Sequence, residues 1–239
     1  MKILSLYNLI MINNTRIEIC IGNIDDAITA SKYPIDRIEL NSALELGGLT
    51  PSLNTVKTLK EKIDTPLCCM VRPRGGDFVY TDIEFETMLL DAKLLLDNGA
   101  DGMVFGFIKD GKVDIDRTSK MVELIHSYNR QAIFHKAFDE IEDLDEALAT
   151  LVDLHIDRVL TGGGQDSDHI VIGAKIIGEL QSKYGDKIEL LPGGGVRIHN
   201  IQDVITNANS HQIHMTSKKT KNGYICLDEQ QLQELLKNI

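Results

Sequence analysis

The sequence lacks the cysteine spacings that mark common metal and redox sites. Its four cysteines form no CxxC pair and no zinc-binding pattern, and Cys68 and Cys69 stand next to each other in an apolar run. This pattern predicts reduced thiols in an intracellular protein, with the adjacent pair acting as small apolar residues of a strand. We therefore expect a cytoplasmic protein.

Positive charge and long hydrophobic runs are also scarce. The chain has 25 Lys and Arg residues against 36 Asp and Glu residues, for a net charge of -11, and a nucleic-acid surface needs a basic face. Residues 1–14 have a leader-like apolar stretch, but it is too short and interrupted to span a bilayer and lacks a small-residue cleavage site. We expect neither nucleic acid nor a membrane as a partner.

No proline- or serine-rich linker and no low-complexity tract divides the chain. Short apolar runs instead alternate with amphipathic segments, which predicts parallel strands joined by right-handed helical crossovers. Eight such units in 239 residues favour an α/β fold of the (β/α)8, or TIM-barrel, class. The expected strands span residues 16–21, 37–41, 66–72, 102–107, 131–138, 158–163, 187–195 and 211–217.

Helix signals between the runs support this fold. Residues 81–99 form an amphipathic segment with Thr81 as the expected N-cap and Gly99 at its end. We expect a single domain over residues 1–239, with the barrel core at about 15–217. The tail, residues 218–239, is expected to pack outside the barrel, its last ten residues as an amphipathic helix.

The stretch MVRPRGGDF, residues 70–78, places two arginines together in an acidic chain. Proline and the two glycines oppose a helix, so Arg72 and Arg74 belong to the loop after the third strand. In a TIM barrel such loops form the active face at the C-terminal mouth. Because guanidinium groups suit carboxylate and phosphate oxygens, we predict that both arginines bind an anion.

Two carboxylates, Glu18 and Glu39, lie in runs that are otherwise mostly apolar. The period of two along a strand places Glu18 on the same side as Cys20. A buried carboxylate needs a partner, and strand order makes Arg72 the expected one. A structural salt bridge and acid/base chemistry both remain open for the two glutamates.

The motif FHKAFD, residues 134–139, follows the fifth expected strand and brings further polar groups to the mouth. Lys136 joins the predicted anion site, whereas His135 is open to a core role as well as a catalytic one. His214, at the end of the eighth expected strand, is equally undecided. The candidate catalytic residues are Glu18, Glu39, His135 and Asp139.

Glycine triplets follow the sixth and seventh expected strands, in TGGGQ at residues 161–165 and PGGGV at residues 192–196. Ordinary tight turns would explain either one. Two of them on consecutive loops of a barrel favour main-chain amides that approach an anion closely. We therefore add Gly163 and Gly194 to the predicted anion site.

At these residues the sequence resembles the CutC family of copper homeostasis proteins. The similarity runs in order through about residues 15–217, and RPRGGDF together with GGLTPS is highly specific. It implies a TIM barrel, a cytoplasmic location and a homo-oligomer, dimer or higher. The matching segments are EIC (18–20), DRIEL (36–40), GGLTPSL (47–53), RPRGGDFVY (72–80), DGMVFG (101–106), FHKAFD (134–139), RVLTGG (158–163) and PGGGVR (192–197).

The resemblance also implies copper as a cofactor, because Cu(I) is proposed to bind cysteines of the family. Cys20 matches one of them, but Asn41 stands where many members have the second. Lys136 and Thr216 replace the usual arginine and serine. One thiolate and one amide make a poor site for Cu(I), so Cys20 is a weak candidate metal ligand and the copper role is doubtful for this chain.

The sequence thus leaves three functions open. The first is a copper-binding or copper-handling protein, as the resemblance implies. The second is an enzyme that acts on a small anionic metabolite, including phosphorylated ones, by acid/base chemistry at the barrel mouth. The third is a barrel that binds such a metabolite without catalysis.

Overall fold

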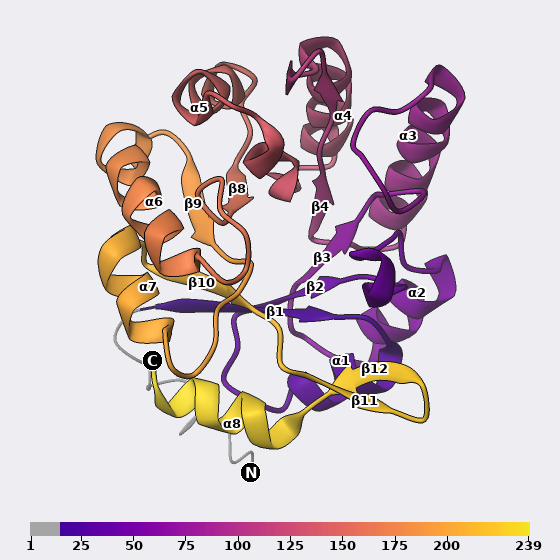
Figure 1. The fold of residues 1–239 in the computed structure, drawn as a ribbon. Helices are drawn as coiled ribbons and strands as arrows, with labels where there is room; N and C mark the ends of the chain where they lie inside the picture. Colours follow the sequence, from indigo (N-terminus) through magenta and orange to yellow (C-terminus); the bar gives the residue numbers. More distant parts are fainter. Residues whose placement is uncertain (1–14) are drawn as a thin grey trace.

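A computed structural model describes residues 15–239, in which eight parallel strands form a nearly closed barrel inside a ring of helices (Figure 1). The predicted TIM-barrel class is confirmed, while the leader-like residues 1–14 lie outside the described part. The barrel strands are β1 (Arg16–Ile21), β2 (Arg37–Leu40), β3 (Leu67–Met70), β4 (Gly102–Phe105), β7 (Gln131–Phe134), β8 (Arg158–Thr161), β9 (Glu189–Pro192) and β10 (Gln212–Met215).

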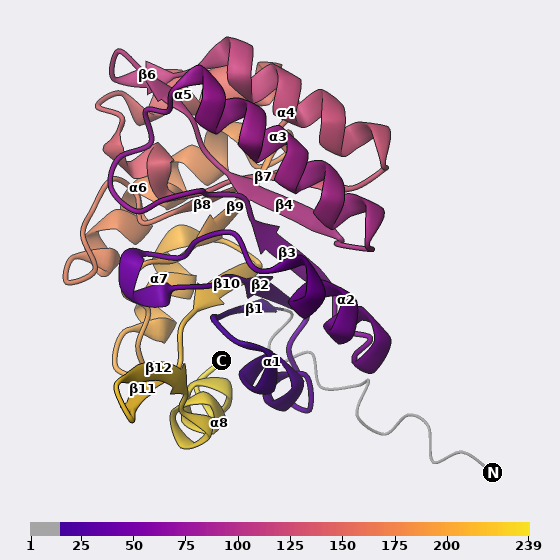
Figure 2. The same ribbon diagram turned by 90° about the vertical axis from the view of Figure 1, so that its right-hand side faces the viewer.

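Eight helices cover the outside of the barrel, one after each of these strands in chain order (Figure 2). This alternation is the repeated βα unit that the sequence pattern predicts. The helices are α1 (Ile24–Ala30), α2 (Leu53–Lys62), α3 (Asp82–Asp97), α4 (Ile115–Ser127), α5 (Leu144–Asp153), α6 (Ile170–Tyr184), α7 (Ile201–Ala208) and α8 (Glu229–Lys237).

The limits of α3 follow from its capping residues. The Thr81 side chain accepts a hydrogen bond from the Glu84 amide, and the Glu84 carboxylate accepts one from the Thr81 amide. Such a capping box satisfies two amides that the first turn leaves unpaired. Gly99, with a φ of 91°, follows the helix in the left-handed conformation that favours glycine. The expected helix start and end are both confirmed.

The strands are hydrogen-bonded in the order β10, β1, β2, β3, β4, β7, β8, β9. Within residues 15–239 no backbone ladder joins β9 to β10. Side chains bridge this seam instead, since Ser210 Oγ and Gln212 Nε2 donate to the Leu190 carbonyl oxygen at 2.8 and 3.3 Å. The barrel is therefore closed by side chains at one seam.

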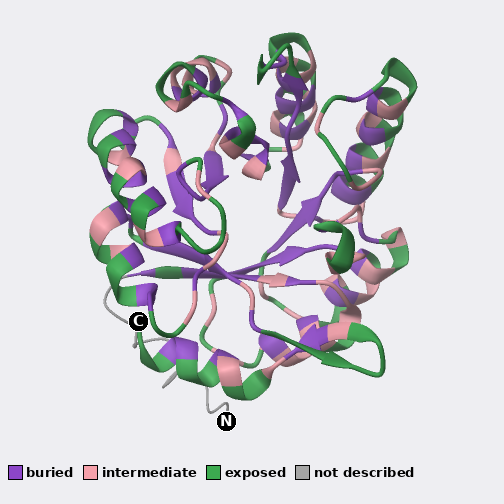
Figure 3. Ribbon diagram, viewed as in Figure 1, coloured by how far each residue is buried: buried purple, intermediate pink, exposed green. Residues whose placement is uncertain are grey.

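Two apolar clusters lie on opposite faces of the strands. The larger fills the space between the strands and the helices, and a smaller one, Cys68, Met70, Val104 and Ile133, lies apart from it on the other face. Strands buried on both faces are typical of a parallel barrel, and Figure 3 shows the barrel strands buried almost throughout. The predicted apolar role of Cys68 and Cys69 agrees with their burial.

Most expected strands end before their apolar runs do, and two of them end earliest relative to the run. The run 131–138 leaves the sheet after Phe134, because His135 caps a short 3-10 helix, Lys136–Glu140. The run 187–195 leaves it after Pro192, where three glycines form a loop. Both departures bring polar groups to the mouth of the barrel.

The remaining elements lie outside the barrel. Two short hairpins, β5 (Ile108–Lys109) with β6 (Lys112–Val113) and β11 (Lys218–Lys221) with β12 (Tyr224–Leu227), were not predicted. Helix α8 follows the second hairpin and contacts the turn after α1, where the Tyr33 hydroxyl donates to Glu229. No helix within residues 15–239 has the length and apolar character needed to cross a membrane.

Candidate functional site

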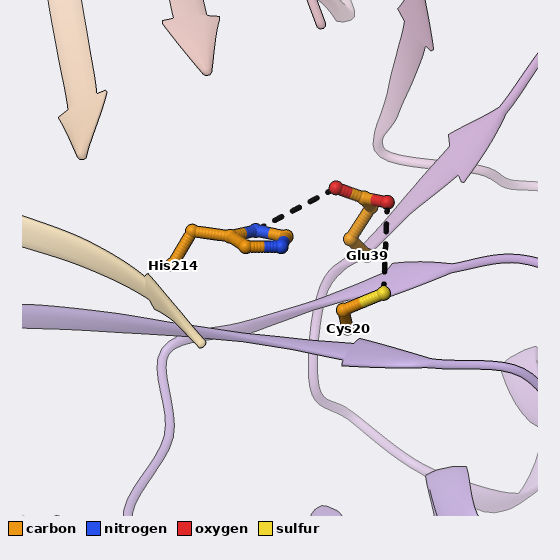
Figure 4. Close-up of side chains that lie close together, drawn as sticks. All are labelled: Cys20, Glu39 and His214. Carbon is orange, nitrogen blue, oxygen red and sulfur yellow. Dashed lines mark hydrogen bonds and ion pairs between the residues drawn. The ribbon is translucent and has the colours of Figure 1, made fainter. Parts of the chain in front are cut away.

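Strand register brings three titratable side chains together inside the barrel. In the parallel ladders Glu18 pairs with His214, and Cys20 pairs with Glu39. His214 Nδ1 lies 2.7 Å from Glu18 Oε1 and 3.5 Å from Glu39 Oε2. Figure 4 shows the imidazole facing the Glu39 carboxylate, with the Cys20 thiol at the other carboxylate oxygen. Glu18, Glu39 and His214, all buried, are called the proton cluster below.

Two buried arginines compensate the charge of Glu18. Arg37 Nε donates to Glu18 Oε2, and Arg158 Nη1 lies 4.0 Å from the same oxygen. The expectation that Arg72 is the partner of the two carboxylates is wrong. Arg37 and Arg158 lie on strands β2 and β8, where their side chains reach Glu18, whereas Arg72 follows the end of β3 and turns to loop carbonyl groups.

The environment shifts the pKa values of the two carboxyl groups of the cluster in opposite directions. Burial opposes the charge of Glu18, but the His214 hydrogen bond and the Arg37 charge outweigh it and lower the pKa of Glu18 to about 2. Burial raises the pKa of Glu39. Although burial lowers the pKa of His214, Glu39 and Glu18 together raise it above its usual value. Ionised Glu18 therefore favours the protonated form of His214, and Glu39 takes up a proton more readily than an ordinary glutamate.

Cys20 completes a group with metal-ligand chemistry. Ligand atoms of Cys20, Glu39 and His214 all lie within 4.8 Å of one another. Burial and the Glu39 charge raise the pKa of the Cys20 thiol well above its usual value. Asn41 Nδ2 donates to Glu39 Oε1 at 2.7 Å and lies 3.4 Å from Cys20 Sγ, so an amide stands where a second thiolate would be needed. A single protonated thiol does not fit a Cu(I) site.

Arg72 is a buried cation that has no carboxylate in ion-pair contact within residues 15–239. Its guanidinium group donates to the carbonyl oxygens of Leu46, Gly48 and Gly76, and its Nε–H has no acceptor. The Phe78 ring lies 4.9 Å from the guanidinium carbon. Because buried charges are normally paired, this arginine suits an anionic ligand.

Arg74 lies in a different environment from Arg72. Its Nε donates to Glu84 at 2.6 Å, and its Nη1 lies 3.2 Å from Asp77 Oδ1. The side chain is about a third exposed and has two carboxylate partners. Arg74 therefore joins its loop to α3, and its predicted contact with an external anion stays a prediction.

His135 is a neutral hydrogen-bond donor in this structure. Its Nδ1 accepts from the Ala137 amide at 3.1 Å, which places the proton of a neutral ring on Nε2. Nε2 is buried and has no acceptor. Burial and the Arg72 charge lower the pKa of His135 to about 3, so the ring is a poor base at neutral pH. It offers an unused N–H close to an unpaired cation.

Asp139 fills the first glycine loop from within. Its carboxylate accepts from the amides of Gly162 and Gly164 at 2.8 and 3.0 Å, and from the Thr161 hydroxyl at 2.5 Å. The Gly163 amide donates to Thr161 Oγ1 at 2.8 Å. The Asp139 carboxylate thus occupies the position in the first loop that was predicted for an external anion. The catalytic role of Asp139 and the anion contact of Gly163 stay predictions.

Sequence reasoning did not predict Arg37 or Arg158 and left His214 undecided. One signal pointed to the arginines, because IDRIEL at residues 35–40 and IDRVLT at residues 156–161 place them at the same position of two βα units. Both side chains reach Glu18.

A cleft of about 960 Å³ beside α5 and the β5–β6 hairpin contains none of the predicted site residues.

The sequence profile of the CutC family matches residues 15–219. The chain belongs to the CutC family. The CutC family protein of Treponema denticola is 43% identical over 209 residues, which cover 87% of this chain and 83% of the relative. The human copper homeostasis protein cutC homolog is 35% identical over 212 residues, 88% of this chain and 76% of the relative. A crystal structure of a CutC copper homeostasis protein from Streptococcus agalactiae aligns with a TM-score of 0.77 and 30% identity, covering 84% of this chain and 97% of that one.

Proposed function

We propose that this CutC-family protein is an enzyme that transfers a proton on a small anionic metabolite at the barrel mouth. The observation that carries the proposal is the proton cluster, in which a buried Glu39 oxygen without a hydrogen bond lies 3.5 Å from the His214 imidazole. Two neighbouring carboxyl groups with pKa values shifted in opposite directions are typical of an acid and a base in one site. A purely structural ion pair would not need the second carboxyl group.

Each group of the site has a defined role in this proposal. Glu39 gives up and takes back the proton, and His214, fixed by Glu18, stabilises its ionised form. Arg72 and His135 offer unused N–H groups to an oxygen of the metabolite that becomes negative during the reaction. Donors fixed in advance where charge develops lower the barrier of such reactions.

Solvent deuterium exchange tests this function without knowledge of the product. Small carboxylated and phosphorylated metabolites are incubated with the protein in D2O and examined by proton NMR. We expect exchange on one class of them, reduced at least about a hundredfold in Glu39→Gln, which is nearly isosteric but takes no proton. Glu189→Gln, at the opposite end of the barrel strands, serves as the control and should keep the rate.

Two outcomes would contradict the proposal. A folded Glu39→Gln variant with full exchange activity would make Glu39 a structural residue. Binding of a metabolite with no exchange or turnover in the wild type would favour a binding barrel without catalysis.

Copper handling is the second candidate, favoured by the cluster of ligand atoms from Cys20, Glu39 and His214. Copper would have to displace the thiol proton and the imidazolium proton, and both groups have a raised pKa. A competition titration with a Cu(I) chelator at pH 6.5 and 8.5 separates the candidates. A tight one-to-one complex at the lower pH, abolished by Cys20→Ser, would favour copper handling over the enzyme.

The location and the assembly of the chain complete the proposal. The four cysteines are all free, which supports a cytoplasmic location. A homo-oligomer, dimer or higher, is supported by Ile83, Leu90 and Leu94, which are exposed apolar residues of α3 at spacings that place them on one face. Light scattering should show a larger species in the wild type than in Leu90→Glu, and equal masses would contradict this assembly face.

A further inference from the structure

The two glycine loops of the mouth differ in how their amides are used. The amides of residues 162–164 all donate to Asp139 or Thr161. In the second loop the Gly193 amide donates to the Thr161 carbonyl oxygen, but the amides of Gly194 and Gly195 have no acceptor within the described chain. Their φ values are 84° and 106°. Successive amides in such a loop form a concave site that suits an oxyanion.

A cation lies directly against this second loop. A Cβ atom added to Gly194 would lie 2.6 Å from Lys136 Nζ, and one added to Gly162 would lie 2.9 Å from it. The ammonium group therefore lies between the two loops, over positions where only glycine leaves room for it. It donates to Asp139 at 2.6 Å, and an ammonium group has three donors, so two remain for a ligand.

The charge of Asp139 does not cancel the attraction of this site for an anion. Its carboxylate is shared among the amides of Gly162 and Gly164, the Thr161 hydroxyl and Lys136. These contacts hold Asp139 in the first loop, while Gly194 of the second loop lies directly against the ammonium group. Lys136 thus serves as a bridge between an internal anion and an external one.

The second loop also adjoins the proton cluster. A Cβ atom added to Gly193 would meet the His214 Cβ and Cδ2 atoms at 2.9 and 3.1 Å. The glycine that contacts His214 and the glycine that contacts Lys136 are thus consecutive, with Cα atoms about 4 Å apart. In TIM barrels the loop after the seventh strand is a frequent phosphate site, and β9 is the seventh barrel strand here.

From these contacts we infer that Lys136 and the amides of Gly194 and Gly195 form a subsite for the phosphate group of a short phosphate monoester. The reacting end of the molecule faces His214 and Glu39, a few bonds from the phosphorus. The inference deepens the proposed function, on which the role of the reacting end rests, by naming the substrate class. Of the two glycine loops predicted to bind an anion, only the second belongs to this subsite.

Calorimetry at fixed ionic strength tests the subsite with two probes, inorganic phosphate and glycerol 3-phosphate. We expect the wild type to bind both, and Lys136→Met to bind both at least about tenfold more weakly. Lys136→Arg, which keeps the charge, should stay within about threefold of the wild type. Lys93→Met is the matched control, because Lys93 also pairs with one carboxylate but lies near the C-terminal end of α3, away from the loops of the mouth; it should bind like the wild type.

Amide NMR gives a second readout that does not depend on the stability of a variant. Phosphate should shift the Gly194 and Gly195 amide signals of the wild type and leave those of Gly163 and Gly164 nearly unchanged. No binding of either probe by the wild type, equal binding by Lys136→Met, or shifts confined to the first loop would each overturn the subsite.

The failure of the subsite is distinguishable from the failure of the proposed enzyme. Glu39→Gln should bind inorganic phosphate like the wild type, because Glu39 is not part of the subsite. Deuterium exchange on non-phosphorylated carboxylates without any phosphate binding would contradict the phosphate subsite but agree with the proposed enzyme. Phosphate binding that depends on Lys136, with no exchange on any metabolite, would agree with the phosphate subsite but contradict the proposed enzyme.

Discussion

Two buried histidines at the mouth of the barrel have pKa values that are shifted in opposite directions. His214, between Glu18 and Glu39, has a raised pKa, whereas burial and the charge of Arg72 lower the pKa of His135 to about 3. The two side chains are buried to a similar extent. Because burial lowers both pKa values, the neighbouring charges account for the difference between them.

The difference divides the mouth into two sides with separate tasks. Around β1, β2 and β10 the carboxyl groups and the imidazolium of the proton cluster can exchange protons. Around β3 and β7, Arg72 and His135 supply positive charge and N–H donors without a carboxylate partner. An anion that binds on the second side would present its reacting atoms to the first.

The largest expected effect comes from removing the charge that compensates the arginines. Glu18→Gln leaves Arg37, Arg158 and His214 buried without their shared carboxylate, and we expect it to lower the free energy of unfolding by about 3–5 kcal/mol. Urea denaturation measures the change. Glu189→Gln removes a more exposed partner of Arg158 and should cost about 1 kcal/mol or less. Equal losses of unfolding free energy in both variants would contradict the larger stabilising role given to Glu18 over Glu189.

The pH dependence of stability should show the neutral state of His135. Its pKa lies below the usual 6.5, so the unfolded chain takes up a proton at this residue before the folded protein does. Stability is therefore lost as pH falls from about 6.5 towards 3, by on the order of 2–4 kcal/mol from this group. His135→Gln should remove this part of the loss in denaturation curves measured across that range, and the exposed His199→Gln should not. The same curve in both variants would contradict the assignment.

Arg72 should contribute to binding a second oxygen-bearing group of the ligand. We expect Arg72→Met to weaken the binding of phosphoglycolate, a carboxylated phosphate ester, by about 1.5–3 kcal/mol, the value of a hydrogen bond to a charged group. Binding of inorganic phosphate should change less, because the phosphate subsite lies at Lys136. Calorimetry with both ligands tests this. Unchanged binding of phosphoglycolate would make Arg72 a support for its loop alone.

The smallest expected effect concerns copper. Because Cys20 has no thiolate partner at Asn41, Cys20→Ser should weaken Cu(I) binding by about tenfold or less, near 1.4 kcal/mol. Competition with a chromophoric chelator measures the affinity. A thousandfold loss of Cu(I) affinity would instead show that Cys20 is a strong copper ligand with further ligands besides Asn41.

The fold could be predicted from the sequence because its signals are local. Each βα unit shows its own periodicity and caps, as the capping box of Thr81 and Glu84 illustrates. The register that aligns Glu18 with His214 is not local, since the two residues are 196 positions apart and meet where the last barrel strand pairs with the first. The sequence therefore indicated which residues reach the mouth but not the cluster that they form.

The error about Arg72 and the use of Asp139 have the same physical origin. Strand order placed Arg72 near the two glutamates, but its side chain turns to the carbonyl groups of its own and a neighbouring loop. Asp139 was assigned to the catalytic group, and it binds amides 23 to 25 residues away. Side-chain direction after a strand depends on loop conformation, which no residue pattern in this sequence specifies.

The measurement that tests the account most directly is the titration of both histidines by long-range ¹H–¹⁵N NMR. The shifts of the ring nitrogens show which protons each imidazole carries. We expect His214 to titrate above the usual histidine pKa of 6.5, and His135 to stay neutral, with its proton on Nε2, down to about pH 3. A His214 that titrates at or below the usual pKa, or a His135 that titrates near it, would contradict the division of the mouth into a proton-exchanging side and an anion-binding side.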